Sequence, residues 1–388
     1  MASGRVLVAK EERRRFSAGE GIDIPFLILI LMLLAVGLTM LYSASSAQSQ
    51  YDTGYSISTK YLQKQAVCAL LGLICMAAFS RVPAQFWLKI AWPLYGVSIL
   101  LLLLVLVAGE SVNGARRWIN IAGIQFQPSE LAKFTMILLF ARLTLYYGVD
   151  AVKFRYGVLG FGAALLGILV PLALEKHLSA IMLIGMVAVV MMFIAGTNPK
   201  WLLAGAGAAA GFVLIYITFM GYAGDRVTAW LHPEQDPGDT GYQILQSLYA
   251  IGSGGLFGLG FGKSRQKYLY LPFQYNDYIF AVICEELGLI GALAIIALFA
   301  ATILRGFWIA LHAQDRFSTV FAAGLVALIA VQTVLNLGVV TNLLPSTGIA
   351  LPFFSYGGTA LAVNLGEMGI LLSISRYRNH TKTQEVSL

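Results

Sequence analysis

Asp277 is the residue of this chain best placed to accept a proton in a reaction. It lies in the segment QYNDYIF, directly before an apolar run and among aromatic neighbours. Such neighbours remove water from a carboxylate and make it a stronger proton acceptor, which is what a general base requires. The alternative is a helix cap, in which the carboxylate accepts backbone N–H bonds and stabilises the helix by about 1 kcal/mol. Position alone leaves both roles open.

Glu285 and Glu286 follow about two helical turns deeper in the same apolar run. Acidic side chains inside a membrane are costly, and they usually face a cavity or an opposite charge. We therefore expect at least one of them to face the protein interior, toward an Arg or a Lys. Two roles fit: support of a catalytic site, or a structural ion pair that holds helices together.

Basic residues gather in two segments of the chain. Arg forks match phosphate oxygens in pairs, and Lys offers a point charge to the same group. These segments predict a site for a pyrophosphate group, unless their charges only face anionic lipid headgroups. The candidates are Arg116, Arg117 and Lys133 in the first segment, and Arg226, Lys263, Arg265 and Lys267 in the second.

Other kinds of site are not expected. The glycine-rich segment 252–262 matches neither GxGxxG nor GxxxxGK[ST], and no predicted strand precedes it, so nucleotide binding is excluded. Its glycines are expected to permit tight packing or a flexible approach to the next span. Cys68, Cys75 and Cys284 lie in apolar runs and the 4 histidines are scattered, so neither a disulfide framework nor a zinc site is predicted.

The elements that must position these residues are transmembrane helices. Apolar residues make up 58% of the chain, charged residues only 12%, and the mean hydropathy is +0.77. Apolar runs of about 20 residues, long enough to cross about 30 Å of hydrocarbon, recur along the chain. In lipid a helix satisfies its own backbone, and no alternating strand pattern occurs. The fold class is therefore an all-α polytopic membrane protein with ten spans, at about 24–45, 61–80, 86–108, 128–147, 155–174, 178–196, 200–220, 277–307, 317–341 and 350–375.

The net charge of +7 could indicate nucleic-acid binding, but basic residues in a membrane protein usually mark its cytoplasmic loops. If the first span runs outward, 16 of the 26 Lys and Arg residues lie on the inner side, both ends face the cytoplasm, and no nucleic-acid partner is expected. We predict one ten-helix membrane domain over 21–378, with cytoplasmic tails at 1–20 and 379–388. A large extracellular loop, 221–276, lies between the seventh and eighth helices.

The link between the last two spans, NLGVVTNLLPSTGIALPFFSYGGTAL, places Pro345, Gly348, Pro352, Gly357 and Gly358 within apolar sequence. Broken backbone at membrane depth is tolerated only where it lines a cavity or is buried in protein. We interpret this link as one wall of a pocket.

Six segments, taken in order, resemble the signature segments of the SEDS proteins, the family of shape, elongation, division and sporulation. They are GARRWI, QPSELAK, GYQILQS, AIGSGGLFGLGFGKSRQK, LPFQYNDYIFAVICEELGLIG and NLGVVTNLLPSTGIALPFFSYGGTAL. The resemblance covers residues 20–378, and the last segment looks more like the FtsW/SpoVE branch than RodA.

This resemblance implies ten transmembrane helices and a peptidoglycan glycosyltransferase that polymerises lipid II into glycan strands at the outer face of the bacterial plasma membrane. It also implies a class B penicillin-binding protein, the transpeptidase that cross-links the strands, and divisome or elongasome components as partners. By the same resemblance, Asp277 matches the family's essential acid, Arg117 the Arg of its GAxRW segment, and Lys133 the Lys of QPSELAK.

One segment departs from the family. Where Glu/Gln-Pro-Asp-Leu-Gly-Thr is common, residues 175–180 read EKHLSA, so no role of that Asp is carried over. Some division-branch members also have a Lys where this chain has Thr347. These departures indicate a divergent paralogue.

The resulting hypothesis is an inverting glycosyl transfer. Asp277 takes the proton from the acceptor's 4-hydroxyl, which attacks the anomeric carbon of the donor, and undecaprenyl pyrophosphate leaves. Basic side chains stabilise the leaving group, and a divalent cation, Mg²⁺ or Mn²⁺, is the one cofactor considered; no organic cofactor is expected. The pyrophosphate candidates are Arg117, Lys133, Arg116, Lys263 and Lys267, with Glu285, Glu286, Ser355, Tyr356, Gly357 and Gly358 in supporting places.

Two other functions use the same features. A transporter that flips lipid II would use Glu285 and Glu286 as a proton relay and the broken segment 342–358 as a gate. A catalytically reduced scaffold would only recruit a transpeptidase, and the altered 175–180 segment is compatible with it.

Overall fold

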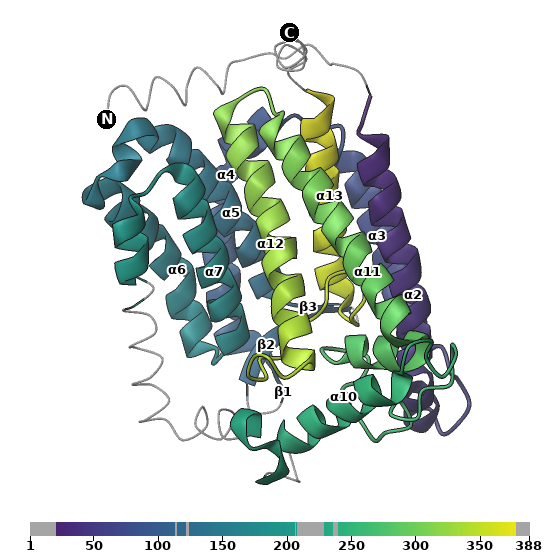
Figure 1. The fold of residues 1–388 in the computed structure, drawn as a ribbon. Helices are drawn as coiled ribbons and strands as arrows, with labels where there is room; N and C mark the ends of the chain where they lie inside the picture. Colours follow the sequence, from purple (N-terminus) through teal and green to yellow (C-terminus); the bar gives the residue numbers. More distant parts are fainter. Residues whose placement is uncertain are drawn as a thin grey trace.

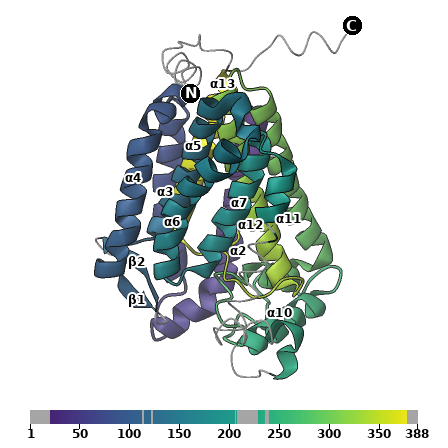
Figure 2. The ribbon, with the colours of Figure 1, turned by 90° about the vertical axis from the view of Figure 1, so that its left-hand side faces the viewer.

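The computed structural model describes residues 21–112, 115–121, 124–205, 207, 229–235 and 240–377. Long helices lie side by side along one direction, and a layer of shorter elements covers one end of them (Figures 1 and 2). We call this the outer end, following the predicted orientation, and it carries α10 (Thr240–Gly254). The bundle confirms the predicted polytopic helical fold.

Nine helical segments in the described part of the chain are long and apolar enough to cross a membrane. They confirm nine of the predicted spans, whereas the seventh, about 200–220, lies largely outside the described residues. The first helix runs further than predicted, to Asp52. The helices are α2 (Ile24–Asp52), α3 (Lys60–Phe79), α4 (Ala84–Ala108), α5 (Pro128–Tyr147), α6 (Phe161–Leu174) after the π-helical η2 (Arg155–Gly160), α7 (Leu178–Ala195), α11 (Ile279–Leu311), α12 (Arg316–Val340) and α13 (Gly358–Arg376).

The first and last of these helices meet at the end of the bundle opposite α10 (Figure 1). Asp23 caps α2 by accepting the backbone N–H of Phe26, and Arg305 of α11 binds the same carboxylate at 2.8 Å. The backbone N–H of Asp23 also donates to Ser375 Oγ near the end of α13 (3.0 Å). Both described ends therefore lie on one side of the bundle, as predicted.

A small antiparallel sheet at the outer end was not predicted. Its strands are β1 (Glu110–Val112), β2 (Ala115–Ile121) and β3 (Ile124–Phe126), in the order β1-β2-β3. β1 and β3 have three residues each, too few for an alternating pattern to stand out in the sequence. The sheet lies directly before α5, so β2 carries the Arg116–Arg117 pair into the neighbourhood of that helix.

The eighth predicted span is broken near its outer end. Gly288 has φ +67° and ψ −170°, which interrupts α11 and leaves backbone groups without partners in their own helix. The glycine-rich segment supplies the missing partners: Leu259 and Gly260 donate to the carbonyls of Glu285 and Glu286 (2.9 and 3.0 Å). The predicted tight packing of the glycines is confirmed, because a Cβ at Gly258 would lie 2.2 Å from the Glu286 carbonyl oxygen.

The last predicted span begins too early. We expected a helix from about 350, whereas α13 begins at Gly358 and residues 345–357 form turns and extended chain. Pro352 has no N–H to donate to a helix, and Gly348 has φ +67°, so the helix cannot extend back through this segment. We call residues 345–357 the broken segment.

Candidate functional site

Asp277 lies at the outer end of the bundle, one residue before the Tyr278 that caps α11. The side chain of Tyr278 makes no capping hydrogen bond, and Asp277 is partly exposed. Asn336 of α12 fixes the backbone here, because its Nδ2 donates both to the Asp277 carbonyl (2.7 Å) and to the Ile349 carbonyl (2.8 Å). The candidate base is thus attached to a rigid support between two helices.

The Asp277 carboxylate faces the broken segment. A Cβ built on Gly348 would lie 3.6 Å from Asp277 Oδ2. The positive φ of Gly348 is strained for other residues, so glycine both permits this bend and keeps the space beside the carboxylate open. Tyr278 adds a further tie, as its hydroxyl donates to Ser346 Oγ at 3.4 Å.

Neighbouring helices hold the rest of the broken segment. Gln65 of α3 donates to the Ser355 carbonyl (3.2 Å) and accepts from the Gly357 N–H (3.1 Å). Tyr356 donates its N–H to the carbonyl of Tyr275 (2.9 Å), which directly links this segment to the chain that leads to Asp277. A Cβ at Gly358 would lie 2.5 Å from Cys68 Sγ, so glycine is required for the close approach to α3. These supporting residues therefore shape the segment that Asp277 faces.

Arg117 and Lys133 lie near His177, at the outer end of the bundle. Arg117 Nη2 donates to the Lys176 carbonyl at 2.5 Å, and the charges of both cations act on the His177 ring. Lys133 is buried and forms an ion pair with Glu130, one turn earlier on α5, at 2.7 Å. Arg116 is exposed and donates to the Leu106 carbonyl. It points away from Arg117, because successive residues of a strand point to opposite faces.

Residues 175–180 connect these cations to the broken segment. His177 Nε2 lies 3.4 Å from Gln127 Nε2 at the start of α5, and Ser179 Oγ donates to the Thr347 carbonyl. Thr347 directly precedes the Gly348 that Asp277 faces. The broken segment therefore faces Asp277 and is also bonded to the 175–180 segment, which Arg117 contacts.

Burial changes the protonation of this connecting segment. It raises the pKa of Glu175 to about 8, against the opposing effect of the Arg117 charge. It lowers the pKa of His177 to about 3, and the charges of Arg117 and Lys133 act in the same direction. The imidazole is therefore neutral at ordinary pH. His177 thus places a neutral group where the family commonly has an acid.

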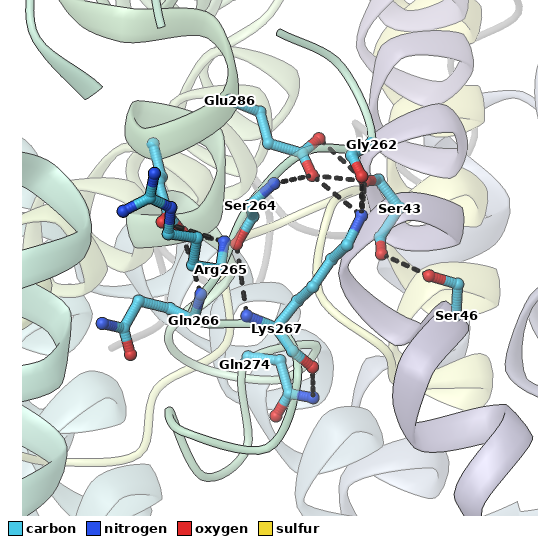
Figure 3. A network of polar contacts seen from close by, with 10 residues as sticks. Ser43, Ser46, Gly262, Ser264, Arg265, Gln266, Lys267, Gln274 and Glu286 are labelled. Carbon is cyan, nitrogen blue, oxygen red and sulfur yellow. Dashed lines mark hydrogen bonds and ion pairs between the residues drawn. The ribbon is translucent and has the colours of Figure 1, made fainter. Parts of the chain in front are cut away.

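Glu285 and Glu286 belong to a separate, closed network, and Figure 3 shows its part around Glu286. Lys267 Nζ forms a buried ion pair with Glu286 (3.2 Å) and donates to the Gly262 carbonyl (2.6 Å). Glu286 also accepts from Ser43 Oγ of α2 at 2.7 Å. Glu285 accepts from Ser264 Oγ and from the backbone N–H of Arg265 (3.0 Å). The prediction that one of these acids faces a basic residue is confirmed.

This network changes how the second basic segment is interpreted. Lys267 is buried and its ammonium is engaged by three oxygen atoms, so in this conformation it is not available to a pyrophosphate. Lys263 is exposed, but no contact joins it to Arg117 or Lys133 among the described residues. The structure thus brings together Arg117 and Lys133 of the predicted cations, and places Lys267 elsewhere.

One buried acid near the candidate cations was not predicted from the sequence. Glu367 is a buried acid of α13 whose surroundings include Lys133 and Glu130, and it was not considered. An acid within the apolar run NLGEMGILL was the available signal.

For the predicted divalent cation, the described residues contain no group of three or more His, Cys, Asp or Glu side chains that could hold a metal ion. They do not by themselves supply such a site, and the cation stays a prediction.

Relatives of known family match nearly the whole chain. The sequence profile of the cell cycle proteins FtsW, RodA and SpoVE matches residues 25–380. A probable peptidoglycan glycosyltransferase FtsW of Geobacter metallireducens is 40% identical over 365 residues, which cover 92% of this chain and 95% of that protein. Stage V sporulation protein E of Bacillus subtilis is 38% identical over 362 residues, which cover 92% and 98%.

Solved structures have the same architecture. A chain from a peptidoglycan synthase complex, solved for the structural coordination of polymerization and crosslinking, is 29% identical with a TM-score of 0.78, covering 92% of this chain and 99% of that one. The rod shape determining protein RodA of Thermus thermophilus is 28% identical with a TM-score of 0.69, covering 92% and 98%. The chain therefore belongs to the FtsW/RodA/SpoVE family of multi-pass bacterial membrane proteins.

Proposed function

We propose that this protein is a peptidoglycan glycosyltransferase that polymerises lipid II at the outer face of the plasma membrane. The observation that carries the proposal is the placement of Asp277, a partly exposed carboxylate on a backbone that Asn336 holds. It faces a bend of the broken segment, and Ser179 bonds this segment to the stretch that Arg117 contacts. Membership of a family whose members include named peptidoglycan glycosyltransferases supplies the reaction.

Asp277 acts as the general base of the transfer. It takes the proton of the 4-hydroxyl of the acceptor N-acetylglucosamine as that oxygen forms a bond to the anomeric carbon of the donor N-acetylmuramic acid. The bond between this carbon and the pyrophosphate oxygen breaks, so the carbon inverts and undecaprenyl pyrophosphate leaves with the electron pair. A base on a fixed support is effective because little reorganisation is needed at the moment of reaction.

Arg117 and Lys133 act on the leaving group. Negative charge develops on the pyrophosphate as the bond breaks, and cations already in place stabilise it without reorganisation. Lys133 is suited to this because it is buried, where its charge is only weakly screened. A class B penicillin-binding protein is the proposed partner, in line with the likeness to a chain of a peptidoglycan synthase complex.

The transporter alternative has less support. It needs Glu285 and Glu286 to exchange protons along a path. Both carboxylates instead accept hydrogen bonds from the 264–266 backbone and from serine hydroxyls, and Glu286 is paired with Lys267. These contacts describe a structural network that attaches the loop to α11.

Polymerisation of labelled lipid II by the purified protein with its transpeptidase tests the proposal. We expect Asp277→Asn and Asp277→Ala to lower the rate by about 100-fold or more, since a positioned base contributes about 10²–10⁴-fold. The matched control is Glu234→Gln, which neutralises an exposed acid of the outer segment 233–235 and should leave the rate unchanged. Polymerisation by both Asp277 variants at the wild-type rate would show that the base is assigned wrongly.

A further inference from the structure

Glu367 lies in the middle of α13 and is only 2% exposed. Both of its carboxylate oxygens are buried, and neither receives a hydrogen bond within the described part of the chain. A buried carboxyl group without donors is unfavourable for folding, and inside a membrane span it suggests a function by default. Glu286, which is buried as deeply, differs because Ser43, Ser264 and Lys267 all donate to it.

The charged neighbours of Glu367 are Lys133 and Glu130, both on α5. Their charges act on the Glu367 carboxyl, with Lys133 attractive and Glu130 repulsive. In the structure Lys133 is paired with Glu130, which lies one turn earlier on the same helix. One buried ammonium group therefore interacts with two carboxyl groups: it forms an ion pair with Glu130 on its own helix, and its charge acts on Glu367 of α13.

We propose that Glu367 is a positioning residue for Lys133. A single carboxylate at Glu130 would draw the ammonium back along α5. The second carboxyl group, on a facing helix, draws it toward the interface of α5 with α13. When a phosphate of the substrate draws Lys133 away from Glu130, Glu367 provides the nearby opposite charge that keeps the ammonium in place. The kinetic part of this inference rests on the proposed function; the pairing of Glu367 with Lys133 does not.

Thermal unfolding of the full chain in detergent tests the pairing without any substrate. Lys133→Met removes the cation shared by the two acids and should lower the Tm. Glu367→Leu should raise the Tm more in the Lys133→Met background than in the wild type. The reason is that in the Lys133→Met protein Glu367 has lost its counter-charge. Residues in contact give such non-additive effects, whereas independent residues do not. Equal changes in the two backgrounds would overturn the proposal.

Polymerisation kinetics test the positioning role. Glu367→Gln keeps the size of the side chain and removes its charge. We expect kcat to fall about tenfold and KM to change less than about twofold, as for an interaction that matters mainly in the transition state. The control is Met368→Leu, a buried neighbour on α13, which should behave as wild type. Wild-type kcat in Glu367→Gln would overturn the positioning role.

The two experiments separate the proposals. If the wild-type protein does not polymerise lipid II, the proposed function fails, and the unfolding measurements still decide whether Glu367 and Lys133 interact. If polymerisation depends on Asp277 but not on Glu367, the proposed function stands and the positioning role does not.

Discussion

Carboxyl groups at four positions of this protein illustrate how the surroundings decide the role of one chemical group. Asp277 is partly exposed and attached to a fixed backbone, which suits a base. Glu286 is neutralised by Lys267 and holds a loop in place. Glu175 is buried beside Arg117 with a raised pKa, and Glu367 is buried without a hydrogen-bond donor among the described residues. The same side chain therefore serves chemistry, structure or charge balance according to its neighbours.

The pKa of Glu175 predicts a pH dependence of stability. In the folded state its pKa is about 8, above the ordinary 4.5. Its contribution to the free energy of unfolding is therefore complete below pH 4.5 and is lost as the pH rises through 8. His177, lowered to about 3, acts oppositely: its contribution is complete above its ordinary 6.5 and is lost as the pH falls toward 3. Between pH 6.5 and 8, Glu175 therefore acts without opposition from His177.

We expect the free energy of unfolding of the wild type to fall by roughly 2 kcal/mol between pH 6.5 and 8, since one titrating group changes it by about 1.4 kcal/mol per pH unit. The Tm should fall accordingly. Glu175→Gln should make this fall clearly smaller, because Gln does not titrate. The measurement is a series of thermal unfolding curves in detergent, with Glu234→Gln as the exposed control. A slope in Glu175→Gln as steep as that of the wild type would contradict the assignment.

At the scale of elements, the break in α11 determines how the catalytic end of the helix is held. Gly288 interrupts the helix, and the freed backbone groups pair with the glycine-rich segment that precedes Asp277 in the chain. Leu289 and Ile290 donate to the carbonyls of Gly255 and Leu256, at 2.9 and 3.2 Å. Together with the bonds from Leu259 and Gly260 to Glu285 and Glu286, these bonds attach both pieces of α11 to the 254–260 loop.

Gly288→Ala should destabilise the protein by about 2 kcal/mol or more and lower polymerisation. The backbone at this position is one that only glycine adopts readily, which costs other residues about 1–3 kcal/mol. A Cβ would also lie 2.3 Å from the Gly258 nitrogen. Gly185→Ala in α7 is the control, since its Cβ would meet nothing within 4 Å. Thermal unfolding compares the two, and equal Tm values would show that the break is not required.

At the scale of the whole molecule, the two ends of the bundle have different characters. The outer end carries α10 and the small sheet, whereas the opposite end joins the start of α2 to the end of α13 (Figures 1 and 2). The broken segment and Asp277 also lie at the outer end, where α11 begins. Ser247 of α10 donates to the Val340 carbonyl at the end of α12 (2.8 Å), so the outer layer is attached directly to the bundle. All the proposed chemistry lies at one membrane surface.

The proposed orientation predicts which surface is reached by reagents outside the cell. Lys263 in the outer layer and Lys153, between α5 and α6, are both exposed. We expect Lys263→Cys to react with a membrane-impermeant maleimide in intact cells, and Lys153→Cys to react only after permeabilisation. The native cysteines lie within spans and should add little background. The reverse pattern would mean that both ends of the chain face outward.

Much of the fold could be predicted because membrane spans depend on local composition. A helix of about 20 apolar residues satisfies its own backbone wherever its neighbours lie. For the same reason, breaks in the pattern indicated the broken segment, although not that α13 begins only at Gly358. The small sheet was missed because β2 pairs with two strands of three residues each, which are too short to show a pattern.

The sequence by itself determined the spans, the family and the candidate base, because apolar runs and the segment around Asp277 can be recognised without knowing any contact. Only the tertiary structure decided which charges meet. The sequence predicts that Lys267 binds a pyrophosphate, but it is buried against Glu286, while Lys133 pairs with Glu130 and its charge acts on Glu367. Coulomb energies depend on distance and burial, and both are set by how the helices pack rather than by the order of residues in the chain.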